Sequence, residues 1–172
     1  MMKIKFIELG QTPIDDDEKQ ALIPNINTLE ELNVWEHENI IEARKWALSP
    51  KVLSRYDIFD VDFLLKLHKK MFDKTWKWAG QLRTSDKNIG CDPNLIRIEL
   101  KKLCGDARYW LDNQTYSTEQ LALVFHHRLV KIHLFPNGNG RQARLVSDCI
   151  IKNLHRRKKL TGRAIISALQ KS

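Results

Sequence analysis

The chain has 172 residues, of which 42% are hydrophobic and 29% are charged, and its formal net charge at pH 7 is +8. These values are typical of a soluble globular protein with one domain and one core. No apolar run is long enough to span a membrane and the N-terminus lacks the apolar segment of a signal peptide, which argues against membrane and secreted proteins. The three scattered cysteines, Cys91, Cys104 and Cys149, form no CxxC pair, so we expect reduced thiols in the cytoplasm.

Residues 1–27 are expected to form an N-terminal arm that wraps on a domain spanning residues 28–172. Alternating polar and apolar residues over 3–7 predict an edge strand. An acidic segment between Pro13 and Pro24 follows it, and the residue before Pro24 should be extended.

Two helices are expected in the first half of the domain. Thr28 and Glu31 have the spacing of a capping box, so a helix should run from Thr28 to Leu48 and end at Pro50. A second should cover Asp60 to Phe72, where His68 lies beside the apolar stripe and is interpreted as a structural residue.

Four more helices are expected after a stretch from Gln81 to Pro93 that has no helical period. One covers Pro93 to Asn113. The next starts at Ser117, which has capping-box spacing to Gln120, and runs through Ile132. After the helix that follows, residues 155–159 are basic, and Thr161 with Gly162 predicts the start of a short last helix over 163–170. The pattern as a whole predicts a mainly α protein.

The stretch from His133 to Arg144 joins two apolar runs of helical spacing through a turn that contains Pro136 and two glycines. The first N–H groups of a helix lack internal partners, and glycines allow an anion to approach them closely. Arg141 and Arg144 are one turn apart, so both can bind phosphate oxygens. His133 is the nearby group that titrates near neutral pH. The residues therefore predict a polyphosphate site with a general base beside it.

The same stretch resembles the signature of Fic domains, also called Fido domains, His-x-Phe-x-Asp/Glu-Gly-Asn-Gly-Arg-x-x-Arg. It departs from that signature at Asn137, where an acidic residue is usual. Other parts of the chain resemble the Fic subgroup called mobile mystery protein B. They are residues 12–15, 22–24, 76–80, 87–90 and 125–129.

The resemblance implies a mainly α Fic-like domain of about seven helices with a small β-hairpin flap. It also implies transfer of AMP from ATP to a Ser, Thr or Tyr hydroxyl of a target protein, with His133 taking the proton of the hydroxyl. Mg²⁺ would bind at Asn137, but more weakly than at a carboxylate, because an amide oxygen carries no net charge. Phe135 would anchor the signature in the core. The implied phosphate-binding residues are Gly138, Asn139, Gly140, Arg141 and Arg144.

Two further roles are implied by the resemblance. The flap would bind the target through Leu82, Arg83, Thr84, Asn88, Ile89 and Gly90. An inhibitory glutamate would pair with Arg144. Glu38 fits the end of the inhibitory pattern, and Glu36 and Glu42 compete with it.

Two other functions remain open. Asn137 favours a nucleotide-binding module with weak or no transferase activity. The charge of +8 and the basic run after His155 favour, less strongly, a nucleic-acid-binding protein. A phosphotransferase like the Doc toxins ranks low, because these have lysine where the chain has Gly140. The subgroup often occurs beside a helix-turn-helix protein, which implies a toxin–antitoxin pair.

Overall fold

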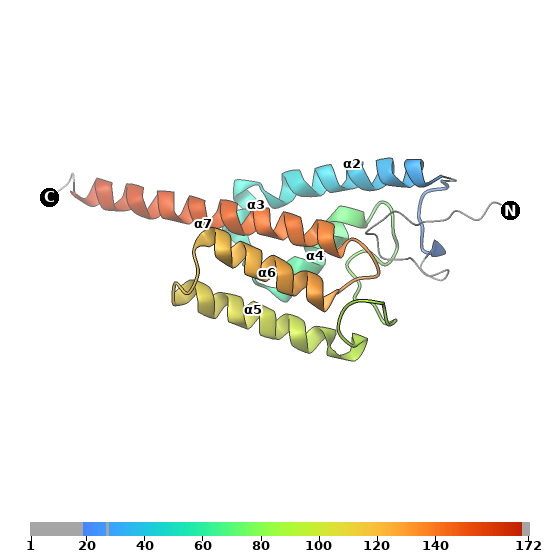
Figure 1. Ribbon diagram of the computed structural model, residues 1–172. Helices are drawn as coiled ribbons and strands as arrows, with labels where there is room; N and C mark the ends of the chain where they lie inside the picture. Colours follow the sequence, from blue (N-terminus) through green and yellow to red (C-terminus); the bar gives the residue numbers. More distant parts are fainter. Residues whose placement is uncertain (1–18, 27, 170–172) are drawn as a thin grey trace.

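The computed structural model of the chain describes residues 19–26 and 28–169, so the predicted edge strand and most of the arm lie outside the described residues. The described part is a bundle of helices (Figure 1). In chain order these are α2 (Leu29–Ala47), α3 (Pro50–Arg55), α4 (Val61–Phe72), the 3₁₀-helix η1 (Pro93–Leu95), α5 (Ile96–Asp112), α6 (Thr118–Ile132) and α7 (Asn139–Leu169). The predicted mainly α class is confirmed. None of the described helices is long and apolar enough to cross a membrane.

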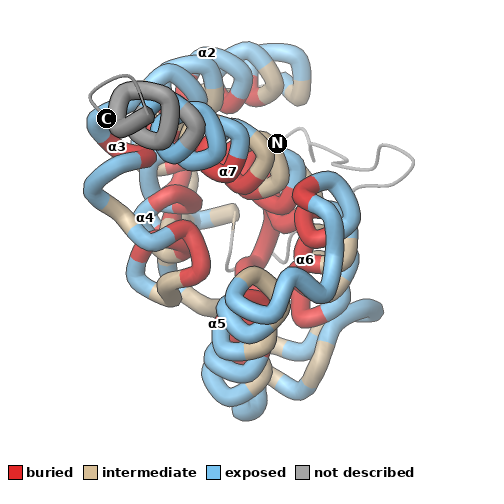
Figure 2. Tube along the Cα trace, turned by 90° about the vertical axis from the view of Figure 1, so that its left-hand side faces the viewer, coloured by how far each residue is buried: buried red, intermediate tan, exposed pale blue. Residues whose placement is uncertain are grey.

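The bundle is built from neighbouring pairs of helices: α6 packs along α7, α5 along α6, and α2 along α4. The buried sides of these helices face one another in the interior of the bundle, as Figure 2 shows. Phe135 of the signature lies in this core, as expected, together with Trp76, Phe63, Phe72 and Phe125. The signature loop is therefore packed on the core rather than lying over it.

Both predicted capping boxes are present. In the first, the Glu31 N–H donates to Thr28 Oγ1 over 3.1 Å, and the Thr28 N–H donates to Glu31 Oε2 over 3.2 Å. The second joins Ser117 and Gln120 in the same way. Each box satisfies two N–H groups that the helix leaves without partners, so the side chains fix where α2 and α6 begin.

One expectation about a helix end is confirmed and another is wrong. α2 ends before Pro50, as expected, with Leu48 as its C-cap. Pro50 also starts α3, a short helix that was not predicted, with Ser49 as its N-cap, because proline fits the first helical position. The break predicted at Thr161 and Gly162 is absent, and α7 continues to Leu169. Thr161 Oγ1 donates to the Arg157 carbonyl of the preceding turn over 3.1 Å, so this side chain does not cap a new helix.

The β-hairpin flap predicted over Leu82 to Gly90 is also corrected: the described structure has no strand there. Backbone N–H groups of this segment instead form hydrogen bonds to carbonyl groups near the start of the signature. The Arg83 N–H donates to the Leu134 carbonyl over 2.9 Å, and the Cys91 N–H donates to the Ile132 carbonyl over 3.3 Å. Residues 82–91 thus form a loop that is bonded to the start of the signature, and we call it the 82–91 loop.

Candidate active site

His133 ends α6 in a left-handed conformation, with φ of 59° and ψ of 69°, and only 2% of it is exposed. Left-handed backbone costs roughly 1–2 kcal/mol for a residue with a Cβ, so the surrounding structure must hold it in place. The turn directs the next residues, Leu134 and Phe135, into the core. The proposed base therefore lies at the point where the chain leaves α6 and enters the signature loop.

The Arg83 side chain fixes the backbone at His133. Its buried guanidinium donates from Nε to the His133 carbonyl over 2.6 Å, from Nη1 to the Ser85 carbonyl over 2.8 Å, and from Nη2 to the Cys91 carbonyl. Arg83 was predicted to contact a target protein, but it is 3% exposed and binds the chain's own backbone. No pattern in the sequence distinguishes such an arginine from a surface residue.

Gly90 shows how closely the 82–91 loop packs on the base. Its φ is +108°, and a Cβ atom there would lie 2.7 Å from His133 Cβ and 2.7 Å from Arg83 Nη2. A side chain at this position would therefore displace either the base or the guanidinium that positions it.

The electrostatics of the site keep the His133 imidazole neutral. Burial is the main cause, and the nearby charges of Arg83 and Lys87 add to it, so the pKa of His133 falls to about 4. At neutral pH the imidazole consequently has a lone pair available to accept a proton.

The turn from Phe135 to Asn139 is closed by a pair of hydrogen bonds. The Phe135 N–H donates to Asn139 Oδ1 over 2.9 Å, and Asn139 Nδ2 donates to the Phe135 carbonyl over 2.8 Å. The Asn139 side chain, which we predicted to bind phosphate, thus stabilises the turn. Gly138 has φ of +81°, and a Cβ there would lie 2.5 Å from the Phe72 ring.

The turn presents the start of α7. This helix begins at Asn139, and the N–H of Gln142 donates to the Gly138 carbonyl over 2.9 Å. The N–H groups before Gln142 precede the first bond of the helix, so the arrangement suits an anion.

His68 holds the signature loop in place through hydrogen bonds of both ring nitrogens. Its Nδ1 accepts the Gly80 N–H over 3.0 Å, so Nε2 must carry the proton that it donates to the Asn137 carbonyl, also over 3.0 Å. The ring is fully buried and stacks on Phe135 with centroids 3.6 Å apart. Burial lowers the pKa of His68 to about 3, which keeps this tautomer neutral. The structural interpretation of His68 from the sequence agrees with this geometry.

Glu36 forms an ion pair with the first signature arginine. Glu36 is 4% exposed, and its carboxylate lies 2.5 Å from Arg141 Nη1 and accepts a hydrogen bond from Trp76 Nε1 over 2.8 Å. Arg141 also donates to Asn137 Oδ1 over 3.2 Å. The expected pair of Glu38 with Arg144 is not formed: Glu38 is exposed, and no bond joins these two described side chains. Glu36 is on the buried face of α2, whereas Glu38 is about 200° farther around the helix.

Arg144 is exposed and lines a groove of about 480 Å³ between α2, α6 and α7. Arg141 lines the same groove, so the two signature arginines share one side of α7 as their spacing predicts. Arg44 and Asp148 line it too and form an ion pair with each other. An anion at the start of α7 could therefore extend into this groove toward Arg144.

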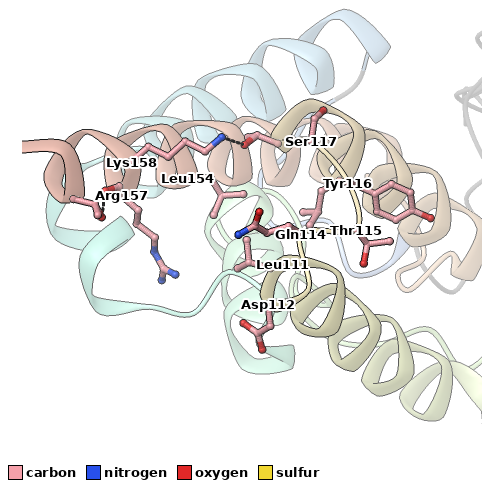
Figure 3. A pocket seen from close by; sticks show the side chains of 12 residues that line it. Leu111, Asp112, Gln114, Thr115, Tyr116, Ser117, Leu154, Arg157 and Lys158 are labelled. Atoms are coloured by element: carbon pink, nitrogen blue, oxygen red, sulfur yellow. Dashed lines mark hydrogen bonds between the residues drawn. The ribbon is translucent and has the colours of Figure 1, made fainter.

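A larger groove, of about 870 Å³, lies between the α5–α6 connection and the C-terminal half of α7. Figure 3 shows its lining, which includes Leu111, Tyr116, Leu154, Arg157 and Lys158. It contains no signature residue, so we place the candidate active site at His133 instead.

The residues around Asn137 do not fit a metal ion held by the protein. Asn137 Oδ1 is a neutral amide oxygen that already accepts hydrogen bonds from Arg141 and from the Gly138 N–H. A cation there would lie against a guanidinium and have no anionic ligand at this position. Among the described residues no group of three His, Cys, Asp or Glu side chains is arranged to hold a metal.

The comparison with known families agrees with this geometry. The sequence model of the Fic/DOC family matches residues 58–151, from just before α4 into the first half of α7. The chain belongs to the Fic/DOC family. Within this family, protein adenylyltransferase fic-1 of Caenorhabditis elegans is 26% identical over 156 residues, which are 84% of this chain and 28% of that protein.

A second adenylyltransferase and a solved structure are also similar to the chain. Protein adenylyltransferase Fic of Nematostella vectensis is 25% identical over 126 residues, covering 69% of this chain and 29% of that protein. The chain thus spans less than a third of the length of these relatives. The crystal structure of BepC of Bartonella tribocorum with bound AMPPNP has a TM-score of 0.60 and 21% identity, over 79% of this chain and 78% of that one. The fold is therefore a Fic fold.

Proposed function

We propose that the chain is a protein adenylyltransferase, which transfers AMP from ATP to a Ser, Thr or Tyr hydroxyl of a target protein. The observation that carries this proposal is the neutral, buried His133 beside the open N-terminus of α7. The names of the relatives, protein adenylyltransferases, support it. The bound AMPPNP in BepC supports a nucleoside triphosphate as the ligand.

In the proposed reaction, His133 accepts the proton of the target hydroxyl. The hydroxyl oxygen forms a bond to the α-phosphorus while the bond from this phosphorus to the bridging oxygen breaks, and pyrophosphate leaves with the electron pair. The pKa of about 4 makes His133 a weak base, so its function is to accept a proton from a hydroxyl whose oxygen is already forming the new bond.

The nucleotide would be held by the start of α7. The backbone N–H groups of Asn139 and Gly140 would bind phosphate oxygens, and that of Gly138 would do so by exchanging its bond to Asn137 Oδ1. The guanidinium groups of Arg141 and Arg144 would bind the outer phosphates. Arg144 is exposed in the groove and could bind phosphate as it stands, whereas Arg141 must exchange or share its contact with Glu36 to do so.

The 82–91 loop would contact the target beside the base. Thr84, Asn88 and Ile89 are exposed, and Ile89 precedes the glycine that packs on His133. Leu82 is half-buried and Arg83 is buried, so these two would position the loop rather than touch the target.

Restraint of the enzyme would come from Glu36 rather than Glu38. The Glu36 carboxylate competes with phosphate for Arg141, and its bond to Trp76 keeps it in place. The segments that resemble mobile mystery protein B support membership of that subgroup, and with it an antitoxin or helix-turn-helix partner as a second restraint.

A nucleotide-binding module with little transfer is the second candidate function, favoured by the neutral Asn137 oxygen and its bond to Arg141. Incubation with ATP labelled at the α-phosphate and a cell lysate, followed by electrophoresis and mass spectrometry, separates the two. Incorporation of AMP that disappears in His133→Ala supports the enzyme. Binding of labelled ATP without incorporation in either protein supports the module.

A further inference from the structure

The solvent-facing side of α2 carries exposed apolar residues. Val34 is 58% exposed and Ile41 is 38% exposed. Glu30 and Glu38 are exposed four residues before and four residues after Val34. The four residues therefore lie on one side of the helix as a stripe, which we call the α2 outer face. The opposite side of α2 is buried, and Figure 2 shows exposed positions along its outward side. Along this stripe the two apolar side chains alternate with the two carboxylates, so the face combines apolar area with negative charge.

The C-terminal half of α7 carries the opposite charge. Lys152, Lys159 and Arg163 are exposed at spacings of seven and four residues, and Leu160, 52% exposed, lies beside them. We call these four residues the α7 basic face. No described carboxylate forms an ion pair with its cations, and the sequence has no acidic residue after Asp148.

The two faces lie at opposite ends of one side of the molecule. The ion pairs Glu36–Arg141 and Arg44–Asp148 show that α2 and α7 run parallel. In Figure 1 the two helices lie side by side, and α7 continues past the end of α2. Each face extends over twelve residues, from 30 to 41 and from 152 to 163. The first and last of twelve helical residues are about 16 Å apart along the axis, so the faces match in length.

A groove lies beside the basic face. It has a volume of about 600 Å³ and is formed by the end of α2 and by α7. Its apolar lining includes Leu48 and Ile151, and Lys152 and Lys159 lie among its basic residues. The groove therefore offers contacts both to carboxylates and to apolar side chains.

We propose that the α2 outer face of one copy of this chain binds the α7 basic face of a second copy in an antiparallel two-fold dimer. A two-fold axis pairs each acidic face with the partner's basic face, so two equivalent contacts form at once and the assembly closes. Glu30 and Glu38 meet lysines and an arginine, while Val34 and Ile41 meet Leu160 and the groove. Nucleic acid would pair with the basic face alone and would leave the α2 outer face uncovered.

The test is a charge exchange between the faces, read as molecular mass by light scattering and sedimentation of the full chain. The acid-to-base variant combines Glu30→Lys with Glu38→Lys, and the base-to-acid variant combines Lys152→Glu with Lys159→Glu. Each variant alone brings like charges together at both contacts, so its dimerisation should weaken at least about tenfold. An equal mixture of the two restores opposite charges at both contacts and should regain the dimer mass.

The matched control combines Arg157→Glu with Lys158→Glu. It makes the same change in net charge, but these side chains line the other groove (Figure 3). The control should dimerise like the unchanged chain, and a thermal midpoint for every variant verifies folding. A monomeric unchanged chain, or a mixture that stays monomeric, overturns the proposal. A monomer that binds random duplex DNA through Lys152 and Lys159 also overturns it, in favour of nucleic acid.

Discussion

Replacing His68 should change how the stability of the protein depends on pH. The imidazole has an ordinary pKa of 6.5, which burial lowers to about 3 in the folded state. Between these values the unfolded chain binds a proton that the folded protein does not. The contribution of His68 is therefore fully present above about pH 6.5 and is lost as the pH falls toward 3.

The magnitude follows from the width of this interval. About pH 5 lies one and a half units below the ordinary pKa, and each unit corresponds to about 1.4 kcal/mol, so the folded state should lose about 2 kcal/mol relative to about pH 7.5. Glutamine at this position cannot titrate but keeps a donor for the Asn137 carbonyl and an acceptor for the Gly80 N–H. His68→Gln should consequently lose about 2 kcal/mol less than the unchanged chain over the same pH change.

Urea unfolding followed by circular dichroism at the two pH values measures the difference. Any titration of His133 is present in both proteins and cancels. His127→Gln makes the same substitution at an exposed position on α6 and serves as the matched control for the loss of one histidine. If His68→Gln destabilises the protein by the same amount at both pH values, His68 is not a buried neutral imidazole in the folded protein.

Four further changes test the site. His133→Ala should abolish AMP transfer but leave ATP binding within about a few-fold, because the imidazole acts on the hydroxyl; filter binding and label incorporation measure the two. Glu36→Gln should increase self-labelling with ATP by freeing Arg141, whereas Glu38→Gln, on the exposed side of α2, should leave the rate unchanged. Arg144→Ala should weaken ATP more than AMP in calorimetry, and equal losses would place the outer phosphates elsewhere. Asn137→Asp adds an anionic oxygen, so transfer at limiting Mg²⁺ should rise; an unchanged dependence of rate on Mg²⁺ would separate this position from the ion.

The sequence predicted those parts of the fold that local chemistry determines. The capping boxes at Thr28 and Ser117 fix helix starts through side chains three residues apart, and these can be found in any single sequence. The end of α7 was mispredicted because Thr161 can either cap a helix or bond back to the preceding turn, and the choice is not local.

The candidate site was predicted where its residues are close in sequence and missed where they are distant. His133, Gly138 and Arg144 lie within twelve residues, so their spacing carries the signal. Glu36 and Arg83 reach the signature from 105 and 50 residues away. No periodicity distinguishes a glutamate or an arginine that binds such a distant group, and the flap was mispredicted for the same reason.

The attachment of the 82–91 loop separates the fixed and the exchangeable parts of the site. Arg83 and Cys91 bond its two ends to Leu134, His133 and Ile132, and Gly90 packs against the His133 Cβ atom. Residues 86, 88 and 89 lie between these attachments and leave the charge of Lys87 near His133 in place, so they could be exchanged for those of another Fic protein without moving the base. A library that varies these three positions would then alter which proteins are modified while every member keeps the same base.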